Sequence, residues 1–273
     1  MKKLLSLVLA LAFVLSLSAA SAQTLTKIVV GATTVPHAEV LELVKEDLAA
    51  LGYELEIVDF VDGYSLPNPA LAANELDANY FQHLPFLNDY NATVSENEQL
   101  VPAIGVHYEP FGLYSGKTKA LTDLKEGGTI TVPNDPSNET RALLLLKEAQ
   151  LITLPADATP DSSLTVLDIV DNPLKLDIKE VDAATLPATL ADADFAVING
   201  NFALDAGLTP AKDAVFLEPA GSEAGKVYTN YVVVRPEDVD ADFVKALQTV
   251  LYTKKVYDYL LANNVVPVFT PAE

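Results

Sequence analysis

Arg141 is the charged side chain of this sequence that is best placed to bind a small anion. It is one of only 17 basic residues in 273, and it follows the polar loop 134–138 at the start of an apolar run. We expect it in the first turn of a helix over 140–150, where free N–H groups and the helix dipole favour anions. Its guanidinium fork matches a carboxylate. The alternative is a surface arginine paired with Glu139 or Glu148.

Two asparagines could contact the same small molecule. Asn199 follows a buried strand expected over 194–198, at the carboxyl end where ligands bind in open α/β sheets. Asn230 directly precedes a strand expected over 231–234. An amide can accept a hydrogen bond from an ammonium group and donate one to a carboxylate. For each asparagine, an ordinary role in a turn is the alternative.

Aromatic and imidazole side chains are concentrated in the short segments 79–86 and 107–111. Together with a tyrosine from segment 60–66, they could line an apolar slot that has a few polar tips. Ordinary core packing is the alternative. The candidate lining residues are Tyr64, Phe81, His83, Phe86 and His107.

The histidines also allow a second interpretation, as metal ligands. His37, His83 and His107, with a carboxylate such as Glu109, are donors that suit Zn²⁺ or Mn²⁺. Their wide spacing matches no compact metal motif, and an arginine at a helix terminus would repel a cation. We therefore expect no metal and no other cofactor, and neutral histidines in the wall of a pocket.

Composition and charge exclude several classes of protein. The chain has 38 acidic and 17 basic residues, a net charge of -21, and no cysteine. We expect no nucleic-acid partner, because a surface with this much negative charge repels phosphate backbones. Without cysteine there is no disulfide, thiolate metal site or cysteine nucleophile. The motifs of serine hydrolases, zinc peptidases and nucleotide-binding enzymes are absent, so we expect no enzyme. A secreted hydrolase is the weakest alternative.

The first residues have the pattern of a secretory signal peptide, which we assign to 1–22. Lys2 and Lys3 precede the apolar segment 4–17, and Ala22 ends a small-residue cleavage site. An uncleaved membrane anchor is the alternative. We expect an exported protein, periplasmic or extracellular, that is not lipid-anchored through cysteine.

The remaining chain alternates strands and helices. A buried strand over 28–32, a helix from Pro36 to Gly52 and a strand over 53–57 predict a parallel βαβ unit. A single amphipathic helix over 243–262 is expected to close the fold.

Two strands could carry the chain between two lobes. The strand over 111–115 could cross into a second lobe, and the strand over 231–234 could return. The sequence thus predicts an α/β protein with two lobes and a cleft between them. We expect lobe 1 over 23–113 plus 232–273 and lobe 2 over 114–231; a single doubly wound sheet is the alternative.

Four segments of the sequence resemble a known family. Residues 29–39, 75–83, 132–146 and 196–201 closely resemble the methionine-binding proteins of bacterial ABC importers, the NlpA lipoprotein family. The resemblance covers nearly all of the chain after the leader, in order. It implies the two-lobed periplasmic-binding-protein fold, type II-like, which traps a free amino acid by hinge closure without covalent chemistry. The implied partners are L-methionine or a related amino acid and a membrane permease, with the protein itself a monomer.

The resemblance also implies roles for the candidate residues. Arg141 would hold the ligand carboxylate, and Asn199 and Asn230 would bind the amino and carboxylate groups. A flexible, polarizable thioether suits an aromatic slot. The residues implied to enclose it are Tyr64, Phe81, His83, Phe86 and His107.

The sequence departs from the family pattern at two places. Ala22 and Gln23 stand where members usually carry a lipidated cysteine, and Phe86 stands where a tyrosine is common. The second change could favour another apolar amino acid or a methionine-containing dipeptide. An importer subunit that binds Zn²⁺ or Mn²⁺ through the histidines is the other open function.

Overall fold

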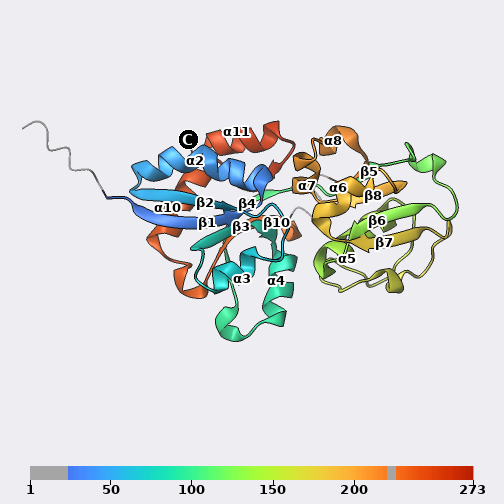
Figure 1. Cartoon of the computed structure of the whole chain (residues 1–273), viewed down its shortest axis with the longest axis horizontal. Coiled ribbons are helices and arrows are strands. Elements are labelled where there is room, and N and C mark those ends of the chain that lie inside the picture. The colour runs from blue at the N-terminus through green and yellow to red at the C-terminus, as the bar shows by residue number, and fades with distance from the viewer. Residues whose placement is uncertain (1–23, 220–225, 273) are drawn as a thin grey trace, which may run out of the picture.

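The computed structural model describes residues 24–219 and 226–272, which form two β-sheets with helices on both faces of each (Figure 1). The strand orders are β11-β4-β10-β3-β1-β2 and β7-β6-β8-β5-β9. The predicted two-lobed α/β architecture is therefore confirmed. The leader predicted over 1–22 lies outside the described residues.

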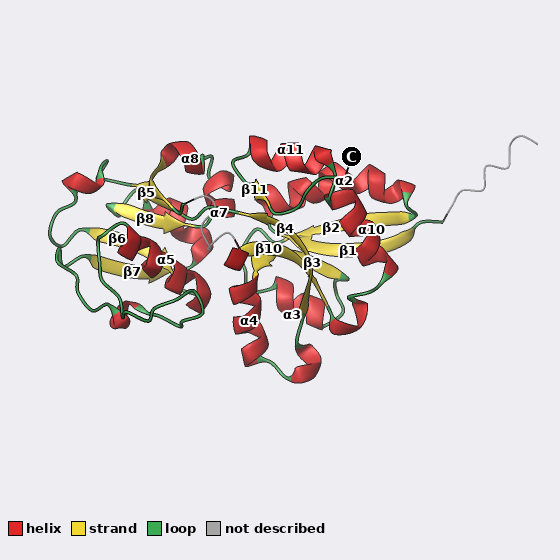
Figure 2. Ribbon diagram, turned by 180° about the vertical axis from the view of Figure 1, so that it is seen from behind, coloured by secondary structure: helices red, strands yellow, loops and turns green. Residues whose placement is uncertain are grey.

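The first sheet and its helices form lobe 1. Its strands are β1 (Thr26–Ala32), β2 (Tyr53–Asp59), β3 (Ala78–His83), β4 (Val101–Tyr108), β10 (Thr229–Val234) and β11 (Val266–Pro267). Its helices are α2 (Glu39–Ala50), α3 (Pro67–Ala72), α4 (Leu84–Thr93), α10 (Asp242–Leu251) and α11 (Lys254–Ala262). Helices α2, α10 and α11 cover one face of the sheet, and α3 and α4 cover the other (Figures 1 and 2).

The second sheet and its helices form lobe 2. Its strands are β5 (Gly112–Ser115), β6 (Thr129–Pro133), β7 (Asp177–Val181), β8 (Phe195–Ile198) and β9 (Ala214–Leu217). Its helices are α5 (Pro136–Glu148), α6 (Leu186–Thr189), α7 (Gly200–Asp205) and α8 (Pro210–Asp213). Helix α5 lies on one face of this sheet, and α6 and α7 lie on the other (Figure 1).

The βαβ unit predicted near the start of the chain is confirmed. Strands β1 and β2 pair in parallel along their whole length, and α2 buries an apolar stripe against them. Gly52 ends the connection from the helix with φ of 95°, a left-handed conformation that glycine adopts without a steric penalty.

The single helix predicted over 243–262 is wrong. The chain instead forms α10 and α11, separated by Tyr252 and an extended Thr253. The carbonyl of Tyr252 accepts a hydrogen bond from Ala272 N–H at 2.8 Å, and Thr253 forms a β-bridge with Ala272. The C-terminal segment thus takes the backbone groups that a continuous helix would need.

The chain crosses between the sheets at two places. The first crossing is 109–111, between β4 and β5, and the second is 218–228, between β9 and β10. A backbone hydrogen bond of 2.9 Å joins Glu218 N–H to the carbonyl of Phe111. Strand β5 pairs only within the second sheet and β10 only within the first, so the expected boundaries would cut both strands. We propose these crossing segments as the division between the lobes.

Within the described part of the chain, every helix is too short or too polar to cross a lipid bilayer.

Candidate functional site

A cavity of about 330 Å³ that is partly open to solvent lies between the two lobes. Both lobes contribute polar and aromatic side chains to it. All the predicted site residues line it except His107. The lining residues are Tyr64, Phe81, Gln82, His83, Phe86, Glu109, Asn138, Arg141, Asn199, Gly200, Asn201 and Asn230.

Sheet register places the lobe 1 residues side by side. Strand β3 is buried along its whole length and ends at His83, and Asn230 on β10 pairs with His83 on one side and with His107 on β4 on the other. Phe86 follows in the first turn of α4. Thus the neighbouring strands β3 and β10, which are far apart in the sequence, bring His83 and Asn230 to one edge of the cavity.

The lobe 2 residues come from two parallel strands. Strands β6 and β8 are neighbours, and each is followed by a helix that begins at the cavity. Asn138 and Arg141 follow β6 on α5, and Asn199 follows β8 directly before α7. The expectation that ligand-facing groups lie at the carboxyl ends of strands fits this arrangement.

Arg141 differs from its expected position and partner. Helix α5 begins at Pro136, with the Asp135 carboxylate accepting from Asn138 N–H at 3.1 Å, so Arg141 lies in the second turn rather than the first. Proline at the first helical position and an aspartate before it explain the earlier start. The alternative of a surface arginine paired with Glu139 or Glu148 is wrong, because Arg141 is only 4% exposed and pairs with Glu218.

The guanidinium of Arg141 is held on three sides. Its Nε donates to Glu218 Oε1 at 3.3 Å, and Nη2 donates to Glu218 Oε2 at 2.5 Å and to the Glu109 carbonyl at 2.9 Å. The ring of Tyr228 stacks on it, with the guanidinium carbon 4.0 Å from the ring centroid. The hydrogen bonds of the guanidinium to Glu218 and to the Glu109 carbonyl use Nε and Nη2 and leave Nη1 outside them.

A chain of amides defines an unsatisfied acceptor. Asn138 Nδ2 donates to the Asp135 carboxylate at 2.8 Å, which fixes the orientation of the Asn138 amide, because a carboxylate only accepts. Asn138 Oδ1 therefore accepts from Asn199 Nδ2 at 2.8 Å. This leaves Asn199 Oδ1 buried and without a hydrogen-bond partner in the part of the chain that the structure describes. Such an orphaned acceptor is costly unless a ligand supplies a donor.

His83 connects the lobes as a neutral group. Its Nδ1 accepts from Phe86 N–H at 3.2 Å, so its Nε2 carries the proton and donates to Asn138 Oδ1 at 3.2 Å across the cavity. Burial, with a smaller effect from Arg141, lowers the pKa of His83 to about 3.

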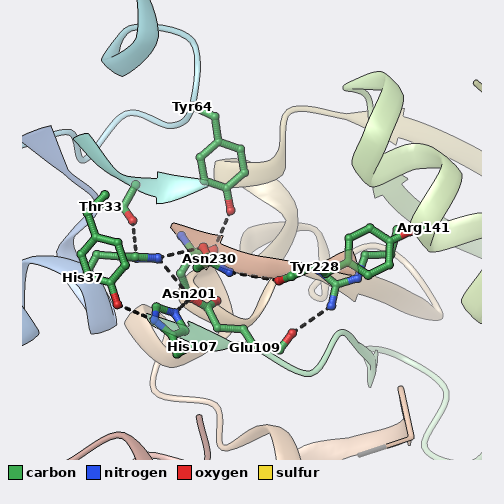
Figure 3. A network of polar contacts seen from close by, with 10 residues as sticks. Thr33, His37, Tyr64, His107, Glu109, Arg141, Asn201, Tyr228 and Asn230 are labelled. Carbon is green, nitrogen blue, oxygen red and sulfur yellow. Dashed lines mark hydrogen bonds and ion pairs between the residues drawn. The ribbon is translucent and has the colours of Figure 1, made fainter. Parts of the chain in front are cut away.

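His107 lies behind the cavity wall, in a buried network with Glu109 (Figure 3). Its Nε2 donates to Glu109 Oε1 at 2.8 Å, and its Nδ1 accepts from the Tyr80 hydroxyl. The second histidine, His37, donates from Nε2 to Asn230 Oδ1 at 3.0 Å and lies 3.3 Å from the same Glu109 oxygen. Burial lowers the pKa of His37 to about 4 and that of His107 to about 3, and burial raises the pKa of Glu109.

The set of three histidines considered for a metal is not brought together. His37, His107 and Glu109 each place one donor atom within 4.8 Å of the others, but His83 is engaged with Asn138 instead. The atoms of His37 and His107 that face Glu109 already donate hydrogen bonds. The geometry is that of a hydrogen-bonded cluster under the cavity.

Aromatic rings form the apolar part of the wall. The Tyr64 ring centroid lies 5.9 Å from that of Phe81, 5.7 Å from that of Phe86 and 4.9 Å from that of Phe202. The Tyr64 hydroxyl donates to Asn201 Oδ1 at 2.5 Å, a contact that links lobe 1 to lobe 2. An unbranched apolar side chain fits such a slot.

Several lining residues were not predicted from the sequence. Asn138 lies at the end of the polar loop noted before Arg141, and Gly200 and Asn201 directly follow Asn199. Glu109 lies in the segment 107–111, which the sequence predicts as part of the pocket wall, but its side chain is singled out only as a candidate metal ligand. A search for polar residues at every strand end would have found these positions, but their convergence depends on how the two lobes meet.

Comparison with known proteins shows the family to which the chain is similar. Residues 28–269 match the family described as NlpA lipoprotein. The methionine-binding lipoprotein MetQ of Bacillus subtilis is 38% identical over 86% of this chain and 84% of its own. The D-methionine-binding lipoprotein MetQ of Escherichia coli is 40% identical over 84% and 80%, respectively. A nutrient-binding protein from Burkholderia cenocepacia, solved with bound methionine, superposes with a TM-score of 0.83 at 40% identity, covering 89% of this chain and all of that one.

Proposed function

This chain belongs to the NlpA lipoprotein family, and from that premise we propose that it is the extracytoplasmic solute-binding subunit of an ABC importer. The ligand we propose is free methionine, bound between the lobes without covalent chemistry. Relatives named for methionine or D-methionine binding, and a related structure solved with methionine, support this choice. The monomeric state and a membrane permease as partner are part of the same proposal.

The observation that carries the proposal is a pair of groups that face one cavity and are available to a ligand. Arg141 Nη1 is a cationic donor for the ligand carboxylate, and Asn199 Oδ1 is an acceptor for its ammonium group. Asn230 has its oxygen engaged by His37, so it contributes its amide nitrogen as a donor to the carboxylate. The two asparagines thus have opposite roles at the two charged groups of one zwitterion.

The aromatic part of the wall completes the fit. A thioether chain would lie against Tyr64, Phe81 and Phe86, while the two charged ends meet polar groups. Another apolar amino acid or a methionine-containing dipeptide is the alternative that the absence of a hydroxyl on Phe86 leaves open.

We propose that the lobes close by a hinge at the two crossings. Glu218 and Phe111, one from each crossing, are joined by a backbone hydrogen bond, and the lobes also meet across the cavity through Tyr64–Asn201 and His83–Asn138. A rotation about the crossings would break the contacts across the cavity and open it, while the paired crossings stay together.

The family name raises the question of membrane attachment. The relatives are named lipoproteins, which conflicts with our expectation of a protein not anchored through cysteine. The sequence has no cysteine to carry a thioether-linked lipid. We propose export without such a lipid; the intact mass of protein purified from its native membrane or culture fraction tests it, and an added mass of acyl chains contradicts it.

Native mass spectrometry of protein purified without added ligand is the test of the ligand. We expect a bound solute with the mass of methionine, released on denaturation. Calorimetry with L-methionine, D-methionine, leucine and a methionine dipeptide then ranks them. Tight zinc binding that excludes amino acids, or no binding of any of these amino acids, would overturn the proposal.

A further inference from the structure

The cavity has one more buried carboxylate than buried cation among its described residues. Arg141 is the guanidinium, Glu218 pairs with it from the second crossing, and Glu109 lines the cavity from the first crossing. Burial lowers the pKa of His37 to about 4 and that of His107 to about 3, so both histidines beside Glu109 are neutral at neutral pH. Each Nε2–H donates a hydrogen bond, and each Nδ1 faces a hydroxyl group. The charge of Arg141 is therefore balanced by Glu218, and the charge of Glu109 is balanced by no buried cation.

The carboxylate of Glu109 is held in a fixed position. His107 Nε2 donates to its Oε1 at 2.8 Å, and the Glu109 side chain is 7% exposed, at the wall of the cavity. Gly200 lies against it so closely that a Cβ on residue 200 would be 2.8 Å from Glu109 Oε2. Packing on one side and donors on the other leave this group little freedom to turn away.

Resting on the proposed function, we propose that Glu109 is the specificity-determining counter-charge for the ammonium group of the ligand. His37 and His107 act as positioning residues that hold the carboxylate, and Asn199 Oδ1 is the second acceptor. The site then selects for a free, protonated amine at the α-position. The carboxylate of the ligand meets a guanidinium that is already paired with Glu218. The charge of the carboxylate therefore contributes less to the affinity than the charge of the ammonium group.

This charge arrangement gives an order of affinities for three ligands with the same side chain. Methionine has both charged groups, methioninamide keeps only the ammonium, and 4-(methylthio)butanoate keeps only the carboxylate. Loss of the ammonium leaves Glu109 buried and unpaired, a situation that costs more than an unmade neutral hydrogen bond. We expect 4-(methylthio)butanoate, the acid without an amine, to bind about 100-fold more weakly than methionine. We expect methioninamide to lose clearly less affinity.

Calorimetry of the full-length mature protein with these three ligands tests the proposal. In Glu109→Gln, which removes the charge but keeps the shape, the loss of affinity on removing the ammonium should shrink to about tenfold or less. Glu46→Gln is the matched control, because Glu46 is exposed on α2 and does not line the cavity. This control should keep the wild-type order.

A measurement on the wild type alone covers the case in which Glu109→Gln does not fold. Burial raises the pKa of Glu109, and a bound ammonium lowers it again, so methionine should release a proton on binding in mildly acidic buffer. The acid without an amine should release fewer protons. The groups that face Glu109 and enter this balance are His37, His107 and Arg141. Titrations in two buffers of different ionisation enthalpy give the proton count.

The outcomes separate this inference from the proposed function. If methionine and 4-(methylthio)butanoate bind with equal affinity, or if both ligands release the same number of protons on binding, the role of Glu109 is overturned. The proposed function is then left intact. An absence of methionine binding overturns the proposed function itself. A wild-type loss of affinity that persists unchanged in a folded Glu109→Gln also overturns the role of Glu109.

Discussion

At the scale of single residues, Arg141 combines a structural role with the binding role that we propose for it. It is buried, it neutralises the buried Glu218, and one of its nitrogens remains for a ligand. Arginine suits this position because it stays charged when buried and offers five donors in a planar fork. Lysine has a single nitrogen and could not serve Glu218, the Glu109 carbonyl and a ligand together.

Replacing Arg141 by alanine should abolish methionine binding and destabilise the fold. Removing one partner leaves Glu218 as an unpaired buried charge, which costs about 3–5 kcal/mol in the free energy of unfolding. Calorimetry and urea unfolding measure the two effects. Arg235→Ala is the matched control, because Arg235 is 14% exposed and donates to the carbonyls of Leu71 and Leu76. That variant should lose stability but keep its affinity; unchanged affinity in Arg141→Ala contradicts the anchor.

Gly200 determines how closely α7 can approach the first crossing. A Cβ at this position would be 2.7 Å from the Cβ of Glu109, which is closer than real contacts allow. We expect Gly200→Ala to weaken methionine binding at least about tenfold, because Glu109 and Asn199 shift together. Gly207→Ala is the comparison: its φ is 76° but its Cβ would meet open space, so it should cost about 1 kcal/mol of stability and leave affinity unchanged. Equal affinities of the two variants would count against the steric argument.

At the scale of elements, helix α10 of lobe 1 supplies stability rather than binding. Helix α10 buries Leu247 completely, together with Val244, Val250 and Leu251, against the sheet. These positions follow the helical period, so the sequence shows them as an apolar stripe. None of them lines the cavity.

Leu247→Ala should therefore change stability without changing affinity. We expect a loss of about 2–5 kcal/mol in the free energy of unfolding, from lost burial and a residual cavity. Leu261→Ala on α11, where the side chain is 50% exposed, should cost well under half of that. Urea unfolding and methionine calorimetry check both. A large affinity change in Leu247→Ala would mean that α10 couples to the closure of the lobes.

At the scale of the whole molecule, neutral histidine side chains join the two lobes and support the cavity. His83 accepts a hydrogen bond within lobe 1 and donates one to Asn138 in lobe 2. A protonated His83 could no longer accept from Phe86 N–H. The contact between the lobes thus requires the neutral form of this imidazole.

The depressed pKa of His83 makes its stabilising effect depend on pH. Its folded pKa is about 3, against an ordinary value of 6.5, so the unfolded chain binds the proton more readily. The contribution of His83 to the free energy of unfolding is fully present above about pH 6.5 and is lost as the pH falls toward 3. Below pH 6.5 this single group should cost about 1.4 kcal/mol of stability per pH unit.

Unfolding measured between pH 6.5 and 4 in the wild type and in His83→Gln isolates this contribution. Carboxyl groups with shifted pKa values act in both proteins and cancel in the difference. The wild type should lose stability more steeply, by about 1.4 kcal/mol per pH unit. Parallel curves for the two proteins would show that His83 does not titrate in this way.

Local patterns in the sequence were sufficient for much of the fold. The βαβ unit of β1, α2 and β2 follows from apolar periodicity and from Gly52, and the two-lobed architecture follows from the order of elements together with the family resemblance. The break between α10 and α11 could not be read in this way, because Ala272 at the other end of the segment takes the carbonyl of Tyr252.

The sequence by itself determined which residue types were available for a zwitterion: one arginine near a helix start, asparagines at strand ends and an aromatic segment. Only the tertiary structure decided their partners. Arg141 meets Glu218, Asn199 is left with a free oxygen, and His107 lies behind Glu109 rather than in the wall. The physical reason is that charge balance and hydrogen-bond satisfaction depend on distances between groups up to 193 residues apart, such as His37 and Asn230. Such distances are set only when two sheets and their crossings pack together.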